Sequence, residues 1–147
     1  MNSDERRAIE ADITRLVHQY VWANDAQDWE LCASLYTEDA VFRRPSGGDP
    51  IVGREAIYAS FTDRPPRAQR HVMANVLVDV EGPATARVKS VIVLYVGDAA
   101  EGGGLPMQDV KSPLIGTYTD LVVQTPKGWR FKERTGALDF RPYGHGG

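Results

Sequence analysis

The spacing of apolar residues changes once along the chain, from about 3.6 residues in the first part to two residues in the second. Between residues 9 and 20 the apolar positions follow the i, i+4, i+7 spacing of a one-sided helix. They are Ile9, Ile13, Leu16, Val17 and Tyr20. Ser3 or Asp4 can cap the start of this helix, where acidic residues also suit the positive end of the helix dipole. The pattern predicts a long helix with one face on a core.

Two shorter helices are predicted next. The segment "DWELCASLY" begins at Asp28, a good N-cap, and places its apolar residues on one side. Gly53 precedes a second helical pattern at Ile57 and Phe61, and the prolines of "DRPPR" end it because proline has no backbone N–H. Between the two helices, "DAVFRR" predicts a short strand.

From His71 onward the apolar residues alternate with polar ones, which predicts strands. Four segments are rich in Val, Thr and aromatic residues: "HVMANVLVDV", "TARVKSVIVLYV", "GTYTDLVVQT" and "GWRFKERTGALDF". The short links "EGP" and "TPKG" indicate tight turns between neighbouring antiparallel strands. Helices followed by a run of strands predict an α+β fold, a cone-shaped barrel in which about three helices pack on a curved mixed or antiparallel sheet. A small-molecule site is expected in the apolar pocket that it encloses.

Length and composition favour one globular domain. The 147 residues are 42% hydrophobic and 25% charged, and this is enough chain to bury a core. We expect a single domain over residues 1–147, with its core at 5–140 and a flexible tail at 141–147. The glycine-rich stretch 97–113 is expected to form a lid or an interface loop.

Charge and cysteine content exclude several classes of protein. The net charge is −3 and the basic residues are scattered, whereas a nucleic-acid binder shows a basic stripe. No apolar run approaches the roughly 20 residues of a membrane span. Cys32 is the single cysteine and lies in an apolar segment, so it is predicted to be a buried small side chain in a reduced, cytoplasmic setting. His18 and His145 form no metal-binding spacing, and no metal site is expected.

Three polar residues could belong to a site, but local pattern leaves their roles open. Asp25 falls about a third of a turn from the centre of the apolar stripe, and Asn24 falls closer to it. By pattern alone, Asp25 is as well explained as a loop or cap residue, and an interior position requires the helix to unwind near Ala23. His71 could equally be a core or edge histidine, and Tyr20 a core aromatic residue.

Several motifs in order resemble one family. They are "Y-x4-D-x2-D-W" from Tyr20 to Trp29, then "LYTEDAVF", "VGREAI", "RHVMAN", and a closing "G-x-Y-x-D…G-W-R-F". Together they resemble the SnoaL-like branch of the nuclear transport factor 2-like superfamily over about residues 5–135. The resemblance implies a cone of helices and curved sheet, and a homodimer formed through the sheet.

The family contains scytalone dehydratase, bile-acid dehydratase, polyketide cyclases and steroid isomerases, and also non-catalytic subunits, so fold alone does not fix function. In its dehydratase-like members an aspartate follows a tyrosine by five residues, and a histidine opens the first long strand. Asp25, Tyr20 and His71 stand at these places. The resemblance implies that His71 is the base, that Asp25 orients it, and that Tyr20 donates a hydrogen bond to the substrate.

Catalytic residues of two individual family members are not expected in this sequence. Scytalone dehydratase has a second catalytic histidine on the following strand, where this sequence has Ser90 and Val91. The arginine and aspartate on adjacent strands that limonene-epoxide hydrolase uses are not expected. Asp120 and Arg134 are expected to form a cross-strand pair.

The sequence therefore predicts a cofactor-independent lyase or isomerase that acts on a small hydrophobic cyclic substrate, either aromatic, polyketide or steroid-like. A polyketide cyclase with the same Asp–His dyad is one alternative, and a non-catalytic ligand carrier or small oxygenase subunit is another. A separation of Asp25 and His71 above about 6 Å excludes the dyad. The expected pocket residues, for each of which core packing is an equal explanation, are Trp22, Asn24, Phe42, Phe61, Met73, Asn75, Ser90 and Ile92.

Overall fold

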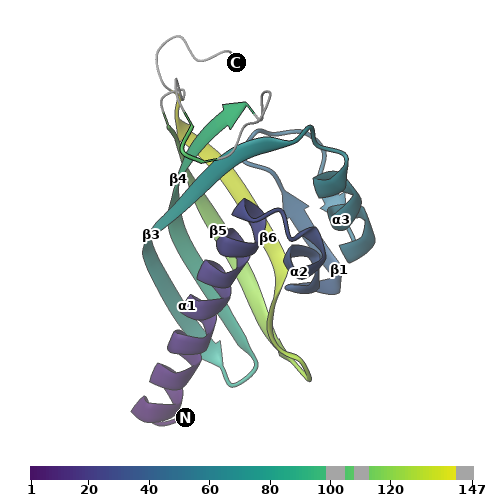
Figure 1. The fold of residues 1–147 in the computed structure, drawn as a ribbon. Coiled ribbons are helices and arrows are strands. Elements are labelled where there is room, and N and C mark those ends of the chain that lie inside the picture. Colours follow the sequence, from purple (N-terminus) through teal and green to yellow (C-terminus); the bar gives the residue numbers. More distant parts are fainter. Residues whose placement is uncertain (99–104, 108–112, 142–147) are drawn as a thin grey trace.

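The computed structural model describes residues 1–98, 105–107 and 113–141, so most of the predicted lid and tail lies outside it. Three helices precede or interleave with six strands (Figure 1). The helices are α1 (Ser3–Asp25), α2 (Trp29–Ser34) and α3 (Arg54–Thr62). The strands are β1 (Tyr36–Arg43), β2 (Ile51–Val52), β3 (Arg67–Gly82), β4 (Thr85–Asp98), β5 (Leu114–Thr125) and β6 (Gly128–Phe140).

The six strands form one mixed sheet in the order β2-β1-β6-β5-β4-β3. Strands β3 to β6 make the predicted antiparallel meander, and β1 joins β6 in parallel. The sheet curves around the helices, and α1 crosses its concave side (Figure 1). The predicted α+β fold is confirmed. The sheet is an open one with β2 and β3 at its edges, because the strand order does not return on itself.

Helix α1 has its N-cap before Ser3 and Asp4, the two residues predicted to cap it. Asn2 is the N-cap: its Oδ1 accepts a hydrogen bond from the Glu5 backbone N–H at 2.8 Å, and the Glu5 side chain returns one to Asn2. This capping box stabilises the first turn of α1. The apolar stripe further along the helix packs against the sheet. The helix continues through Asp25, so the expected unwinding near Ala23 is wrong.

A β-bulge in β3 changes which residues of that strand face the core. Ala74 pairs with Val91 and Leu77 with Lys89, so β3 carries one extra residue between the two pairs. Asn75 lies in this bulge with φ at +52°. The bulge exchanges the inward and outward positions of the strand after it.

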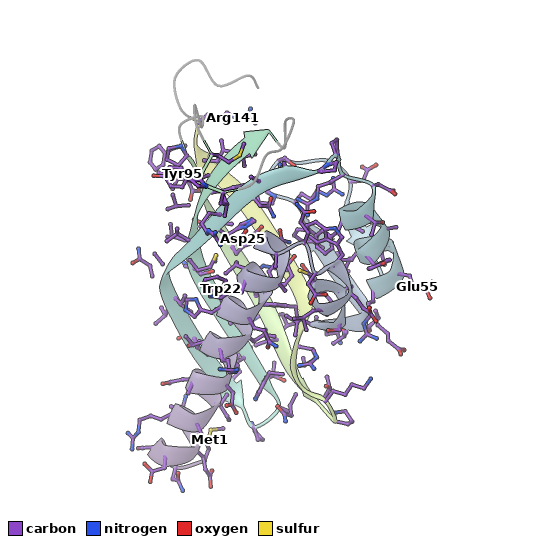
Figure 2. The ribbon with its side chains drawn as sticks, in the orientation of Figure 1. Met1, Trp22, Asp25, Glu55, Tyr95 and Arg141 are labelled. Atoms are coloured by element: carbon purple, nitrogen blue, oxygen red, sulfur yellow. The ribbon has the colours of Figure 1, made fainter. Side chains whose placement is uncertain are left out.

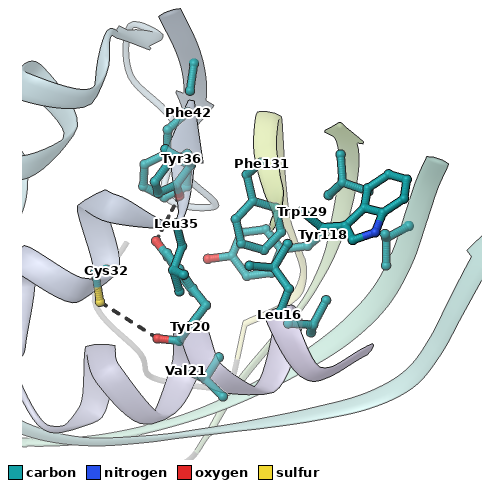
Figure 3. Packing of buried hydrophobic residues seen from close by; sticks show 14 of the residues in the cluster. Leu16, Tyr20, Val21, Cys32, Leu35, Tyr36, Phe42, Tyr118, Trp129 and Phe131 are labelled. Atoms are coloured by element: carbon teal, nitrogen blue, oxygen red, sulfur yellow. Dashed lines mark hydrogen bonds between the residues drawn. The ribbon is translucent and has the colours of Figure 1, made fainter. Parts of the chain in front are cut away.

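Aromatic side chains fill the narrow end of the cone (Figure 3). The rings of Tyr20 and Tyr36 meet edge to face at 5.6 Å, and Phe131 lies 5.5 Å from Tyr20. Trp129 and Phe131 point to the same side of β6, as alternation predicts. Cys32 is fully buried, and burial raises the pKa of its thiol to about 12, which confirms it as a core residue.

An arginine and an aspartate are sealed behind these rings. Arg134 on β6 pairs with Asp120 on β5, both side chains are fully buried, and Arg134 Nε lies 3.4 Å from Asp120 Oδ1. Arg134 Cζ lies 3.9 Å from the ring centre of Tyr118 and 4.5 Å from that of Tyr20. The predicted cross-strand pair is confirmed, and the expectation that no arginine and aspartate share adjacent strands is wrong.

Burial raises the pKa of the Asp120 carboxyl from 3.8 to about 6, although the charge of Arg134 acts in the opposite direction. Burial also acts to lower the pKa of Arg134. The facing Asp120 carboxylate, helped by Tyr118, Tyr36 and Tyr20, outweighs this and raises it. Arg134 therefore stays charged while Asp120 titrates in the mildly acidic range.

No helix in the described part of the chain is long and apolar enough to cross a membrane.

The Asp120 carboxyl predicts a pH-dependent stability. An acid whose pKa is higher in the folded state binds more protons when folded, so its contribution to the free energy of unfolding falls as the pH rises between the two pKa values. We expect the wild type to lose stability relative to Asp120→Asn as the pH rises from about 4 to about 6. Urea unfolding of both proteins over this range measures the difference. A wild-type advantage that grows with pH would contradict the raised pKa.

Candidate active site

The C-terminal end of α1 lies against the free edge of β3, and Asp25 connects the two (Figure 2). Asp25 Oδ1 lies 2.5 Å from His71 Nδ1. Asp25 Oδ2 accepts a hydrogen bond from the backbone N–H of His71 at 2.9 Å. Only 4% of the Asp25 side chain and 10% of the His71 side chain are exposed. The distance between these two side chains is well below the 6 Å limit. Asp25 is the last residue of α1, so the helix reaches His71 without unwinding.

Three further hydrogen bonds, from two glutamine side chains, hold this junction. Gln69 Nε2 donates to Asn24 Oδ1 at 2.6 Å and to the Asn24 carbonyl at 3.1 Å. Gln27 Nε2 donates to the Arg67 carbonyl at 3.0 Å. Because Arg67, Gln69 and His71 alternate along β3, one helix end meets three successive inward positions of the strand.

The chemistry of the dyad follows from which ring nitrogen is occupied. A carboxylate accepts from Nδ1–H, which leaves Nε2 unprotonated and able to accept a proton. Within the residues that the structure describes, Nε2 makes no hydrogen bond. The imidazole is thus held in the tautomer that a general base requires.

His71 of the dyad lines a cavity of about 300 Å³ between α1, α3 and the concave side of the sheet. Its wall is largely apolar. The residues that line it are Tyr20, Asn24, Phe42, Arg44, Pro45, Ser46, Phe61, Arg64, Arg67, His71, Ile92, Leu94, Leu114, Gly116, Tyr118 and Leu138. Six of the residues expected at the site are among them: Tyr20, Asn24, Phe42, Phe61, His71 and Ile92.

Four residues expected in the pocket lie elsewhere. Trp22 is 68% exposed on the outer side of α1, where Arg70 Cζ lies 5.8 Å from its ring centre. Met73 packs against the core and does not line the cavity. Asn75 is exposed, because the β3 bulge turns it away from the face of His71. Ser90 is fully buried and does not line the cavity.

Two tyrosine hydroxyls are placed differently. Tyr20 Oη lies 2.9 Å from Tyr36 Oη, so the hydroxyl that sequence singled out already has a partner in the core (Figure 3). Tyr118 lines the cavity and is 6% exposed, and its hydroxyl makes no hydrogen bond to another described residue. Gly136 leaves room for that ring, since a Cβ there would lie 2.9 Å from Tyr118 Cε1 and 2.4 Å from Pro45 Cγ. Sequence reasoning missed Tyr118, because its place in a regular strand alternation gives no distinguishing signal.

Three arginines also line the cavity and were not singled out by sequence: Arg44, Arg64 and Arg67. Arg64 and Arg67 bracket the two prolines of "DRPPR", directly before the strand that carries His71. The two arginines of that segment indicate a basic cluster next to the candidate base.

Among residues 1–98, 105–107 and 113–141, no three His, Cys, Asp or Glu side chains gather closely enough to hold a metal ion.

Solved structures of other proteins share the fold of this chain. A search of curated proteins gives no match. Among solved structures, a proposed scytalone dehydratase from Novosphingobium aromaticivorans is 22% identical and aligns over 99% of this chain and 100% of that one, with a TM-score of 0.78. A protein from Catenulispora acidiphila, solved in complex with S-DNPA, is 22% identical over 90% of this chain and 95% of its own, with a TM-score of 0.74.

A nuclear transport factor 2-like protein with a cystatin-like fold, also from Novosphingobium aromaticivorans, is 24% identical, with a TM-score of 0.71 and coverage of 90% and 83%. These similarities establish the fold. The sequence model of the SnoaL-like domain matches residues 5–135, which is most of the chain. The chain therefore belongs to the SnoaL-like domain family.

Proposed function

We propose that this protein is a cofactor-independent lyase or isomerase that acts on a small hydrophobic cyclic substrate through Asp25 and His71. The observation that carries the proposal is the 2.5 Å contact between Asp25 Oδ1 and His71 Nδ1 at the wall of an apolar cavity. The names of two structural relatives, a proposed scytalone dehydratase and a complex with S-DNPA, support small-molecule chemistry in this fold.

The reaction begins with proton abstraction. His71 Nε2 takes a proton from the carbon next to a ring carbonyl, and the electron pair moves into an enolate. In a dehydration, the hydroxyl on the next carbon then leaves as the carbon–carbon double bond forms. The imidazolium returns the proton to that oxygen, so water departs and His71 ends neutral. Asp25 stabilises the imidazolium while it carries the proton.

An enolate oxygen needs a hydrogen-bond donor, and the cavity offers Tyr118 and Tyr20. We assign this role first to Tyr118, since it lines the cavity and its hydroxyl has no hydrogen-bond partner among the described residues, while the Tyr20 hydroxyl is bonded to Tyr36. The guanidinium of Arg134 lies 3.9 Å from the centre of the Tyr118 ring. Burial raises the pKa of the Tyr118 phenol, and the charge of Arg134 acts in the opposite direction. Tyr118 therefore keeps its proton and can donate a hydrogen bond to the enolate oxygen.

The same enolate starts a double-bond shift or a ring closure, so isomerisation and polyketide cyclisation use the dyad in the same way. In each case the apolar wall excludes water and strengthens the polar contacts to the reacting group.

Removal of either dyad member tests the proposal. A convenient probe is 3-hydroxy-1-tetralone, whose dehydration gives fluorescent 1-naphthol, and exchange of its α-hydrogens in D₂O reports the first step even if dehydration is slow. We expect His71→Ala and Asp25→Asn to lower the exchange rate by about 10²–10⁴-fold. Asp25→Asn keeps an acceptor for the His71 N–H but places an amide N–H against Nδ1. Exposed His18 on α1 supplies the control variant, His18→Ala. Wild-type exchange in either dyad variant would refute the assignment.

The two tyrosines can be separated by hydroxyl removal. Tyr118→Phe should lower turnover by about 10-fold or more, because the enolate loses a donor. Tyr20→Phe should act mainly on stability, by about 1–3 kcal/mol, because it leaves the buried Tyr36 hydroxyl unpaired. Turnover and urea unfolding of both variants check this. A larger loss of turnover in Tyr20→Phe would return the donor role to Tyr20.

We also propose a homodimer through the outer face of the sheet. Four large apolar side chains are exposed there: Val72 (47%), Leu77 (59%), Tyr95 (45%) and Phe140 (69%). Figure 2 labels Tyr95 on the side of the sheet away from the helices. Light scattering should give the mass of a dimer for the wild type and of a monomer for Tyr95→Glu. Tyr58→Glu, at an exposed tyrosine of α3, is the control. A monomeric wild type would contradict the proposal.

A further inference from the structure

The charged side chains of the cavity wall are all arginines. Arg44, Arg64 and Arg67 line it, and none of its lining residues is an aspartate or a glutamate. The whole chain, by contrast, has a net charge of −3. A wall that contains guanidinium groups is unfavourable for a purely apolar ligand. Such a ligand would remove water from the guanidinium groups without replacing its hydrogen bonds, and this costs free energy.

The protein itself holds these arginines in place without neutralising them. Arg64 Cζ lies 5.2 Å from the ring centre of Trp29 and 5.0 Å from that of Phe61. Arg67 Nε donates to Gln69 Oε1 at 2.9 Å, which leaves its terminal nitrogens unused by that contact. Aromatic faces and an amide oxygen fix the guanidinium planes but bring no negative charge.

No carboxylate of a described residue comes within 4 Å of the three guanidiniums, and all five ion pairs that the structure contains there involve other basic groups. Burial lowers the pKa of Arg64, Tyr20 acts to raise it, and the neighbouring charge of Arg44 acts to lower it. Burial and then the charge of Arg64 lower the pKa of Arg67. Arg64 is thus close enough to Arg44 and to Arg67 for their charges to repel, and a bound anion would relieve that repulsion.

We propose that Arg44, Arg64 and Arg67 form an oxyanion subsite, so that the ligand is a cyclic apolar acid with a carboxylate or phosphate group. The inference rests on the proposed function in placing the reacting ring beside His71. The rest of the wall accommodates such a ring, with Ile92, Leu94, Leu114 and Leu138 as its apolar surface. A cavity near 300 Å³ is at the small end of ligand pockets, which favours a fused-ring compound over a long chain. Arginine recognises both carboxylate and phosphate by paired N–H donors.

Matched probes test the subsite without knowledge of the natural substrate. The first pair is 2-naphthoate and its neutral methyl ester, and the second is 2-naphthyl phosphate and neutral 2-naphthol. Calorimetric titration should give at least a roughly 10-fold tighter Kd for one acid than for its neutral partner. The acid with the larger preference identifies the group as carboxylate or phosphate. Equal affinity within both pairs would overturn the proposal.

Variants assign the preference to the arginines. Arg64→Gln and Arg67→Gln should each reduce it by about 10-fold, and Arg64→Lys should keep part of it because the charge remains without the planar fork. Arg70→Gln is the matched control, since Arg70 is on the same strand but lies over Trp22 outside the cavity. Thermal melts establish that each variant is folded. A preference that persists in both the Arg64→Gln and Arg67→Gln variants would place the anion elsewhere and overturn the assignment.

Titration of His71→Ala separates this inference from the proposed function. The subsite predicts that this variant keeps the preference for the acid. If the dyad variants retain full proton exchange while the acid preference stands, the proposed reaction fails and the subsite holds. If they lose exchange while acid and neutral probes bind equally, the subsite fails and the reaction stands.

Discussion

The contact on which the cavity depends is the carboxylate of Asp25 against His71. One oxygen accepts from the backbone N–H at the free edge of β3 and the other meets the imidazole ring. An open sheet leaves its edge strands with unpaired backbone groups, and a covering helix is one way to satisfy them. Here the last turn of α1 does so, and it fixes the helix across the concave side. The space left between helix and sheet is the cavity.

Because one carboxylate serves both the backbone and the ring, fold and proposed chemistry are coupled at Asp25. Neighbouring side chains also hold α1 against β3. Gln69 donates hydrogen bonds to Asn24, and Gln27 donates one to the carbonyl of Arg67. These bonds keep α1 on β3 when the charge at Asp25 is removed, so an asparagine there tests the tautomer more than the fold. The same junction places Arg67 and His71 on one wall, which joins the proposed anion subsite to the dyad.

Periodicity predicted nearly every helix and strand, because burial on one face determines both spacings. It failed where local geometry breaks the period. The β3 bulge turns Asn75 outward, and Trp22 lies off the apolar stripe of α1. The meeting of Asp25 and His71 could be anticipated only from family motifs, since 46 residues separate them. Arg44 and Arg64 lie in connecting segments without a period, and nothing in a single sequence shows that such segments converge.

The positive charges around the cavity favour reactions that pass through an anionic intermediate. Three arginines line its wall, and a fourth, Arg134, lies behind the ring of Tyr118. Asp120 pairs with Arg134 and opposes its charge, and burial raises the pKa of the Asp120 carboxyl to about 6. Positive potential in a water-excluding cavity lowers the free energy of an anionic intermediate relative to its neutral precursor. A base alone would serve many reactions, but a base within such a potential favours those that pass through an enolate. Dehydration, double-bond migration and ring closure share that intermediate, so the electrostatics support the proposed class of chemistry, and the shape of the apolar wall would discriminate among its members.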